Sequence, residues 1–195
     1  MKPIALLALV LVACAAKQPT RSTSSFAFRA EGGGGFSPDY GGAGLGSASA
    51  AFATEGVCCG LGAYVLGLGH WGGKAKRRRV DTALSAGLEM SSMVSQRIGV
   101  QLRAGAAGTP PTVPMLGRRG FLGSGTLVLR LSDPTPPAVS AWAPLTELGL
   151  GVSWLSLNAE RSSAGPSPTR SSEPTNAFDV LLTLRFGAAY GLELK

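Results

Sequence analysis

Strict alternation of apolar with polar or small residues near the C-terminus constrains the fold of this chain more than any other feature. Between 178 and 194 every second residue is apolar, while the intervening positions include Asp179, Arg185 and Gly187. A period of two places the apolar residues on one face of a strand, whereas a helix would scatter them around its axis. We therefore predict a long, two-faced β-strand over this segment.

The same alternation recurs upstream and predicts an all-β chain. Leu84, Ala86 and Leu88 alternate with Ser85 and Gly87, and comparable runs follow. Eight strands are predicted, at 26–33, 43–54, 57–70, 82–94, 96–107, 119–131, 145–158 and 177–194. We read the Gly32–Gly35 run as a flexible loop.

The lengths of the predicted connections also alternate. Those near 54–56 and 94–96 are short, 132–144 is intermediate, and 34–42, 71–81, 108–118 and 158–176 are longer. This alternation is typical of membrane barrels with short turns at one end and longer loops at the other. The fold class predicted is a single antiparallel up-and-down β-barrel of about eight strands.

Alternation does not say which face meets water, so the residue types on the second face must decide. Charged residues make up only 15% of the chain and the mean hydropathy is +0.21. The second face is rich in Gly, Ala and Ser, which suit the narrow interior of an eight-stranded barrel. Its charges have both signs, so they can pair inside; they are Glu89, Glu147, Asp179, Glu193, Arg97, Arg103, Arg130 and Arg185. We predict that the apolar face meets lipid.

The first fourteen residues have the features of an export signal. Lys2 is followed by an apolar run too short to span a bilayer, which ends at Cys14. The segment Leu11-Val12-Ala13-Cys14 resembles the lipobox of bacterial lipoproteins. That resemblance implies cleavage before Cys14 and its lipidation, with Ala15 favouring transport to the outer membrane. The alternative is an ordinary secretory signal cut near Ala16.

The predicted barrel, as an architecture, resembles the small eight-stranded outer-membrane proteins of the OmpA and OmpX type. The stretch from Arg185 to Leu192 is similar to their C-terminal insertion signal, which implies the barrel-insertion machinery as a partner. Membrane barrels carry aromatic girdles at both interfaces. The candidates here are Trp71, Trp154, Tyr64, Phe121, Phe178 and Tyr190.

One segment is strongly basic. Five of the six residues from Lys74 to Arg79 are positive, namely Lys74, Lys76, Arg77, Arg78 and Arg79. Arginine forks bind phosphate well, so these residues are candidates for contact with lipopolysaccharide phosphates. A partner protein or a solvated loop are the alternatives. Although the net charge is +7, export argues against nucleic acid as a partner.

The search for catalytic chemistry is mostly negative. We expect His70 to lie at the membrane interface beside Trp71, although a lipid-modifying His–Ser pair with Ser85 or Ser124 is an alternative. Motifs for zinc, phosphate loops or a nucleophile elbow are not found. We therefore expect no enzyme activity, no metal and no cofactor. The adjacent Cys58 and Cys59 are read as small apolar strand residues, with a vicinal disulfide or metal binding as alternatives.

These features together predict a lipoprotein signal peptide at 1–13, a lipidated flexible tether at 14–25 and a β-barrel domain at 26–195. The expected function is that of an outer-membrane lipoprotein, a structural or interaction component of the bacterial envelope. The alternative is a soluble β-barrel or β-sandwich domain that its lipid tethers to the outer membrane as a subunit of an envelope complex.

Overall fold

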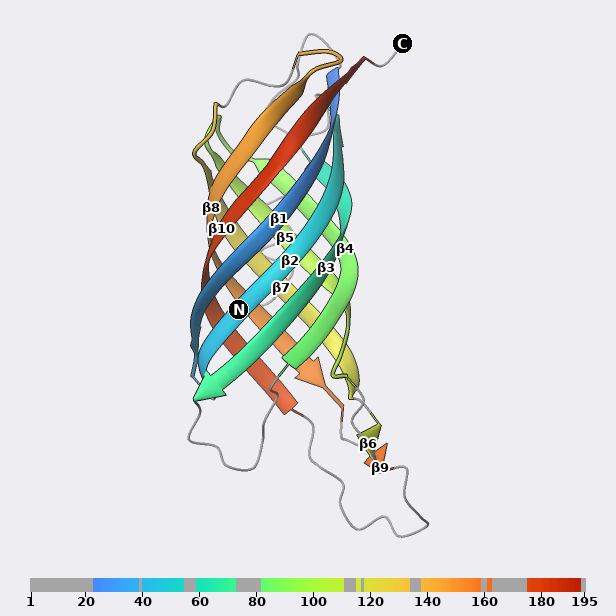
Figure 1. Cartoon of the computed structure of the whole chain (residues 1–195), viewed down its shortest axis with the longest axis vertical. Coiled ribbons are helices and arrows are strands. Elements are labelled where there is room, and N and C mark those ends of the chain that lie inside the picture. Colours follow the sequence, from blue (N-terminus) through green and yellow to red (C-terminus); the bar gives the residue numbers. More distant parts are fainter. Residues whose placement is uncertain are drawn as a thin grey trace.

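Eight long strands form one closed antiparallel barrel (Figure 1). The computed structural model describes residues 23–38, 40–54, 59–72, 82–110, 115–116, 118–133, 138–158, 161–162 and 175–193. Around the barrel the strands follow the order β1-β10-β8-β7-β5-β4-β3-β2, and β1 closes it against both β10 and β2. The predicted fold class is confirmed. Within the described ranges, no helix is long and apolar enough to cross a membrane.

The strand positions agree closely with the predicted ranges. The barrel strands are β1 (Thr23–Ser37), β2 (Gly41–Thr54), β3 (Cys59–Gly72), β4 (Thr82–Met93), β5 (Ile98–Gly108), β7 (Arg119–Arg130), β8 (Trp142–Leu157) and β10 (Thr175–Glu193). Two further short strands, β6 (Met115–Leu116) and β9 (Arg161–Ser162), pair with each other outside the barrel.

Most of the longer connections join strands at one end of the barrel. The ends of β3, β5 and β8 and the starts of β4, β7 and β10 lie at the lower end in Figure 1, which we call the long-loop end. The ends of β2, β4 and β7 and the starts of β3, β5 and β8 lie at the upper end, together with the start of β1 and the end of β10. This is the predicted arrangement with two exceptions. Only three residues separate β1 from β2, and the β7–β8 connection, 131–141, is longer than the β3–β4 and β5–β7 connections.

The interpretation of Gly32–Gly35 as a flexible loop is wrong, because all four glycines lie within β1. A Cβ added to Gly33 would lie 2.3 Å from the carbonyl oxygen of Leu182, and one added to Gly35 only 1.8 Å from that of Val180. Glycine allows this approach of the β1 and β10 backbones because it has no side chain. The run therefore continues the strand where β1 and β10 approach closely.

The barrel interior is filled by an ionic middle and two apolar zones. Toward the long-loop end lies an apolar zone of Tyr40, Ala43, Tyr64, Leu66, Leu68, Ala83, Ala107, Leu122, Leu155, Leu157, Ala177 and Leu181. Ala27, Leu145 and Ala189 form a smaller one near the opposite end. We predicted small and ionic residues inside, so the large aliphatic side chains toward the long-loop end are an addition to that prediction.

Candidate functional site

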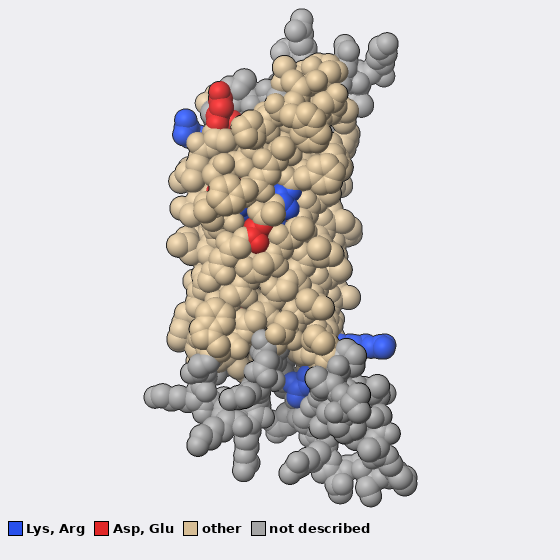
Figure 2. Space-filling model, in the orientation of Figure 1, with Lys and Arg blue, Asp and Glu red and all other residues tan. Residues whose placement is uncertain are grey.

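The outer wall of the barrel is apolar over most of its area. Along β10 the side chains of Leu182, Leu184 and Phe186 are exposed, whereas Arg185 between them is 2% exposed. The same alternation holds on β4, where Leu84 and Leu88 are exposed and Ser85 and Glu89 are buried. Figure 2 accordingly shows a wall with few charged atoms between its two ends. The apolar strand faces thus point outward and the small and ionic faces inward, as predicted.

Exposed aromatic residues gather near both ends of the wall. Near the long-loop end they are Phe36, Trp71, Phe121, Trp154 and Phe178, and toward the opposite end Phe28, Phe52 and Trp142, while the exposed Phe186 lies between the two groups. On β8, Trp142 and Trp154 are separated by twelve residues, which is about 40 Å along a strand and about 28 Å along the axis of a barrel tilted by roughly 45°. The two aromatic bands are therefore spaced like the girdles of a membrane barrel.

One of the predicted girdle residues, Tyr64, differs from this pattern, whereas Tyr190 lies in the band opposite the long-loop end. Tyr64 lies inside the barrel, 3% exposed, because it falls on the inward face of β3. Its hydroxyl lies 3.1 Å from Ser85 Oγ, and the Arg103 guanidinium stands 5.4 Å from its ring centroid. Tyr190 is half-buried and packs 5.1 Å from Trp142, a girdle residue that the sequence pattern did not identify.

A buried ionic cluster occupies the middle of the interior. Glu31 accepts hydrogen bonds from Arg103 Nη1, from Arg185 Nε at 3.0 Å and from Ser47 Oγ at 2.9 Å. Arg103 Nε also donates to Glu89 at 3.0 Å. The side chains of all four charged residues are at most 3% exposed. Such pairing offsets much of the cost of burying their charges.

The cluster extends through a second carboxylate on β8. Glu147 lies 3.6 Å from Arg29 Nε and 3.5 Å from Arg130 Nη2, and Arg29 also reaches Glu89 at 3.4 Å. Strand register creates much of this network, because Arg185 is paired across the sheet with both Glu31 and Glu147. Four arginines and three glutamates from β1, β4, β5, β7, β8 and β10 thus fill the barrel's cross-section.

Most of the charges predicted to point inward do so, with one correction. Glu89, Glu147, Asp179, Arg103 and Arg185 are buried and Arg130 is half-buried. Arg97 is exposed, because it lies in the turn between β4 and β5 and not on a strand. The Glu193 side chain lies outside the described part. Sequence reasoning missed Arg29 and Glu31, which the same period-two rule would have placed opposite Phe28 and Ala30.

The prediction that His70 is interfacial is wrong. His70 is buried inside the barrel, and its Nε2 lies 2.9 Å from Asp179 Oδ1. Ser153 Oγ donates to the other oxygen of that carboxylate at 2.9 Å. Trp71 does lie on the outer wall, 60% exposed, since the next residue of a strand points to the opposite face.

The polar group formed by His70, Asp179 and Ser153 does not have the order of a hydrolytic triad. The carboxylate lies between the imidazole and the hydroxyl, whereas nucleophilic catalysis needs the imidazole to contact the hydroxyl. Of the two serines considered from sequence, Ser85 contacts Tyr64, and Ser124 lines a cavity of about 10 Å³ next to Glu31 and Arg103. That volume holds about one water molecule.

Several predicted site residues fall outside the described part of the chain. They are Cys14, Cys58 and the basic residues Lys74, Lys76, Arg77, Arg78 and Arg79, and the Cys59 side chain is likewise not described. The strands that flank the basic segment end at Gly72 and begin at Thr82, both at the long-loop end. Among the described side chains, no group of three potential ligands could hold a metal ion.

The described geometry therefore consists of an apolar outer wall with two aromatic bands and an interior filled by paired charges. A scan against protein-family models and a search of curated proteins gave no match for this chain. The likeness to small eight-stranded outer-membrane barrels is one of architecture, namely eight antiparallel strands in a closed barrel.

Proposed function

We propose that this protein is an outer-membrane lipoprotein whose barrel spans the bilayer and serves the bacterial envelope as a structural or interaction component. The observation that carries the proposal is that apolar side chains are exposed on the wall and charged side chains are buried, the reverse of a water-soluble protein. Leu150, Leu182 and Leu184 are exposed on the wall, while Glu31, Glu89 and Arg185 are buried and paired. In water such a wall would be a large aggregation-prone surface.

A bilayer accounts for the other features of the wall. Closure of the sheet leaves the barrel without open strand edges, which the hydrocarbon region of a membrane requires. The two aromatic bands lie about 28 Å apart by the strand geometry above, close to the thickness of the hydrocarbon core. A soluble barrel tethered by its lipid, the second candidate, has no comparable use for an exposed apolar wall.

The filled interior favours a role for the surface and loops over transport. An eight-stranded barrel is just wide enough for side chains to fill it. Here the ionic cluster fills the middle of the interior and the apolar zone fills the part toward the long-loop end. We therefore expect no solute path and no catalytic activity. The basic segment Lys74–Arg79 is proposed to contact lipopolysaccharide phosphates, or alternatively an envelope protein.

Lipid attachment at Cys14 and membrane insertion of the barrel are tested by one set of variants. We expect the native chain to incorporate labelled palmitate and Cys14→Ser not to. Cys14→Ser supplied with a cleavable secretory leader should remain in the membrane and require detergent for extraction, because the barrel holds it there. It should also migrate faster on gels before heating than after.

Release of the Cys14→Ser protein into detergent-free buffer, with no effect of heating on its migration, would instead support the tethered soluble barrel. For catalysis, a His70→Ala strain is expected to keep its lipid A acylation pattern. A changed pattern would favour a lipid-modifying enzyme.

A further inference from the structure

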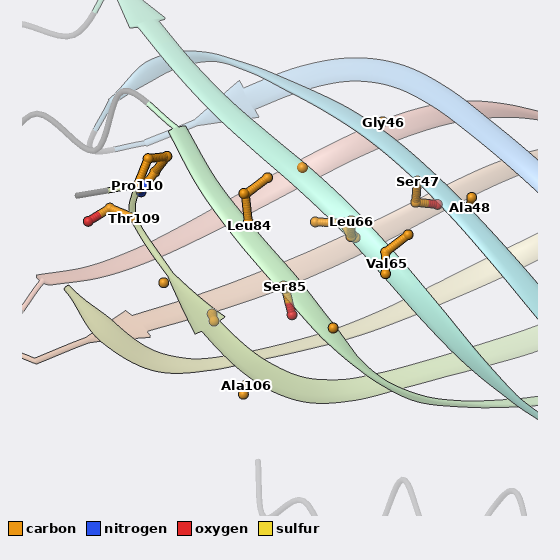
Figure 3. A pocket seen from close by; sticks show the side chains of 14 residues that line it. Gly46, Ser47, Ala48, Val65, Leu66, Leu84, Ser85, Ala106, Thr109 and Pro110 are labelled. Carbon is orange, nitrogen blue, oxygen red and sulfur yellow. The ribbon is translucent and has the colours of Figure 1, made fainter. Parts of the chain in front are cut away.

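An apolar groove crosses the outer wall over β2, β3, β4 and β5. It has a volume of about 740 Å³, within the range of sites that hold small ligands. Small residues form much of its lining, among them Gly46, Ala48, Gly67, Ala86 and Ala106, while Val65 and Leu84 stand beside them. Figure 3 shows Thr109 and Pro110 at one end of the groove and Ala48 toward the other.

The groove is confined to one half of the barrel. Thr109 and Pro110 directly follow β5 at the long-loop end, and Leu84 is the third residue of β4 at that end. Val65, in contrast, is the middle of β3. In a bilayer the groove would thus run from the membrane midplane to one interface, which is the depth of a single leaflet.

A basic side chain stands at the interfacial end of the groove. Arg119 is exposed and is the cross-strand partner of Gly108, which lines the groove and has no side chain to block it. The backbone there is held in place, because Thr109 N donates to Arg118 O at 3.0 Å and Arg118 N donates to Thr109 Oγ1 at 2.9 Å. An arginine in this position extends its guanidinium to the headgroup level.

We propose that this groove binds one anionic membrane lipid, with an acyl chain along the small residues of β2–β5 and its phosphate at Arg119. The inference rests on the proposed membrane-spanning barrel. A flexible acyl chain follows a shallow trough across four strands, and van der Waals contact is what apolar groups gain within a membrane. The exposed Arg119 at the interfacial end matches a ligand whose charge is also at one end.

The test compares variants that fill the groove or remove its charge with a matched control. Gly67→Leu fills the groove, since the nearest atom to a Cβ there is Leu84 Cδ2 at 3.7 Å. Gly125→Leu is the control, because it is an outward glycine on β7 that does not line the groove and has Leu102 Cδ2 at 3.5 Å. Arg119→Gln removes the charge.

Each protein is refolded into mixed micelles that contain dioleoylphosphatidylglycerol or dioleoylphosphatidylcholine, and retained lipids are counted by native mass spectrometry. The native barrel and Gly125→Leu should retain one phosphatidylglycerol in preference to phosphatidylcholine. Arg119→Gln should reduce that retention about tenfold, which corresponds to one charge-assisted hydrogen bond. Gly67→Leu should reduce the retention of both lipids.

Equal retention by all four proteins would overturn the proposal. A dimer lost selectively in Gly67→Leu would also overturn it, since a second copy would then occupy the groove. Vesicle flotation before the lipid count keeps the two proposals separate. A barrel that floats with vesicles but retains no lipid refutes only the groove site, whereas one that stays in the buffer refutes the membrane-spanning barrel.

Discussion

Removing the carboxylate of Glu31 should strongly destabilise the barrel. Glu31→Gln keeps the side chain's size but leaves Arg103 and Arg185 facing a neutral amide. The cluster of four arginines and three glutamates has a net charge of about +1, and the substitution raises it to about +2. Arg103 keeps Glu89 at 3.0 Å, but Glu89 also contacts Arg29, and Glu147 contacts Arg29 and Arg130, so two carboxylates remain for four arginines.

The size of the effect follows from the burial of the partners. At an effective dielectric of about 20, two charges 4 Å apart attract by about 4 kcal/mol, and Glu31 has two such partners. Desolvation of the carboxylate offsets much of this in the native protein. In the variant Arg103 and Arg185 remain buried without the Glu31 carboxylate, so the free energy of unfolding should fall by about 3–5 kcal/mol.

Urea unfolding in neutral-lipid vesicles, followed by tryptophan fluorescence and by gel migration without heating, measures that free energy. The control is Arg97→Gln, which removes a charge from an exposed turn and should cost no more than about 0.5 kcal/mol. The double variant Glu31→Gln/Arg185→Gln should be more stable than the sum of the single effects implies, by at least about 1.5 kcal/mol. A Glu31→Gln effect no larger than that of Arg97→Gln would refute the buried cluster.

Further substitutions test the wall, the tight contact of β1 and the buried histidine. Leu150→Arg, at the middle of β8, should lower the free energy of unfolding in lipid by about 2–4 kcal/mol. Val139→Arg, which lies outside the barrel strands, should lower it by about 1 kcal/mol or less. Equal small decreases for both variants would refute a lipid-facing wall. Gly33→Ala should lower the folded fraction on gels, since its Cβ would meet the β10 backbone, whereas Gly46→Ala, with no atom within 4 Å, should not. His70→Ala should lower the free energy of unfolding in urea by about 1–3 kcal/mol, because it removes a partner of the buried Asp179 carboxylate. An unchanged urea midpoint would contradict the contact between His70 and Asp179.

The strand pattern could be predicted from sequence because it depends on local geometry. A period of two fixes which residues share a face wherever the strand lies in the barrel. The period therefore predicts that Leu182, Leu184 and Phe186 lie on the face opposite Arg185. The orientation of those faces also followed from sequence, since Gly, Ser and charges of both signs fit a narrow interior better than a hydrated surface.

The partners of the buried charges were decided only by closure and register. Glu31 and Arg185 are 154 positions apart, and they meet because β1 pairs with β10 to close the sheet. His70 reaches Asp179 across the barrel, and β1 continues through its glycines because β10 approaches closely enough to require them. The period of each strand is a property of its own backbone, whereas contacts between strands depend on their relative register, which single-strand periodicity does not contain.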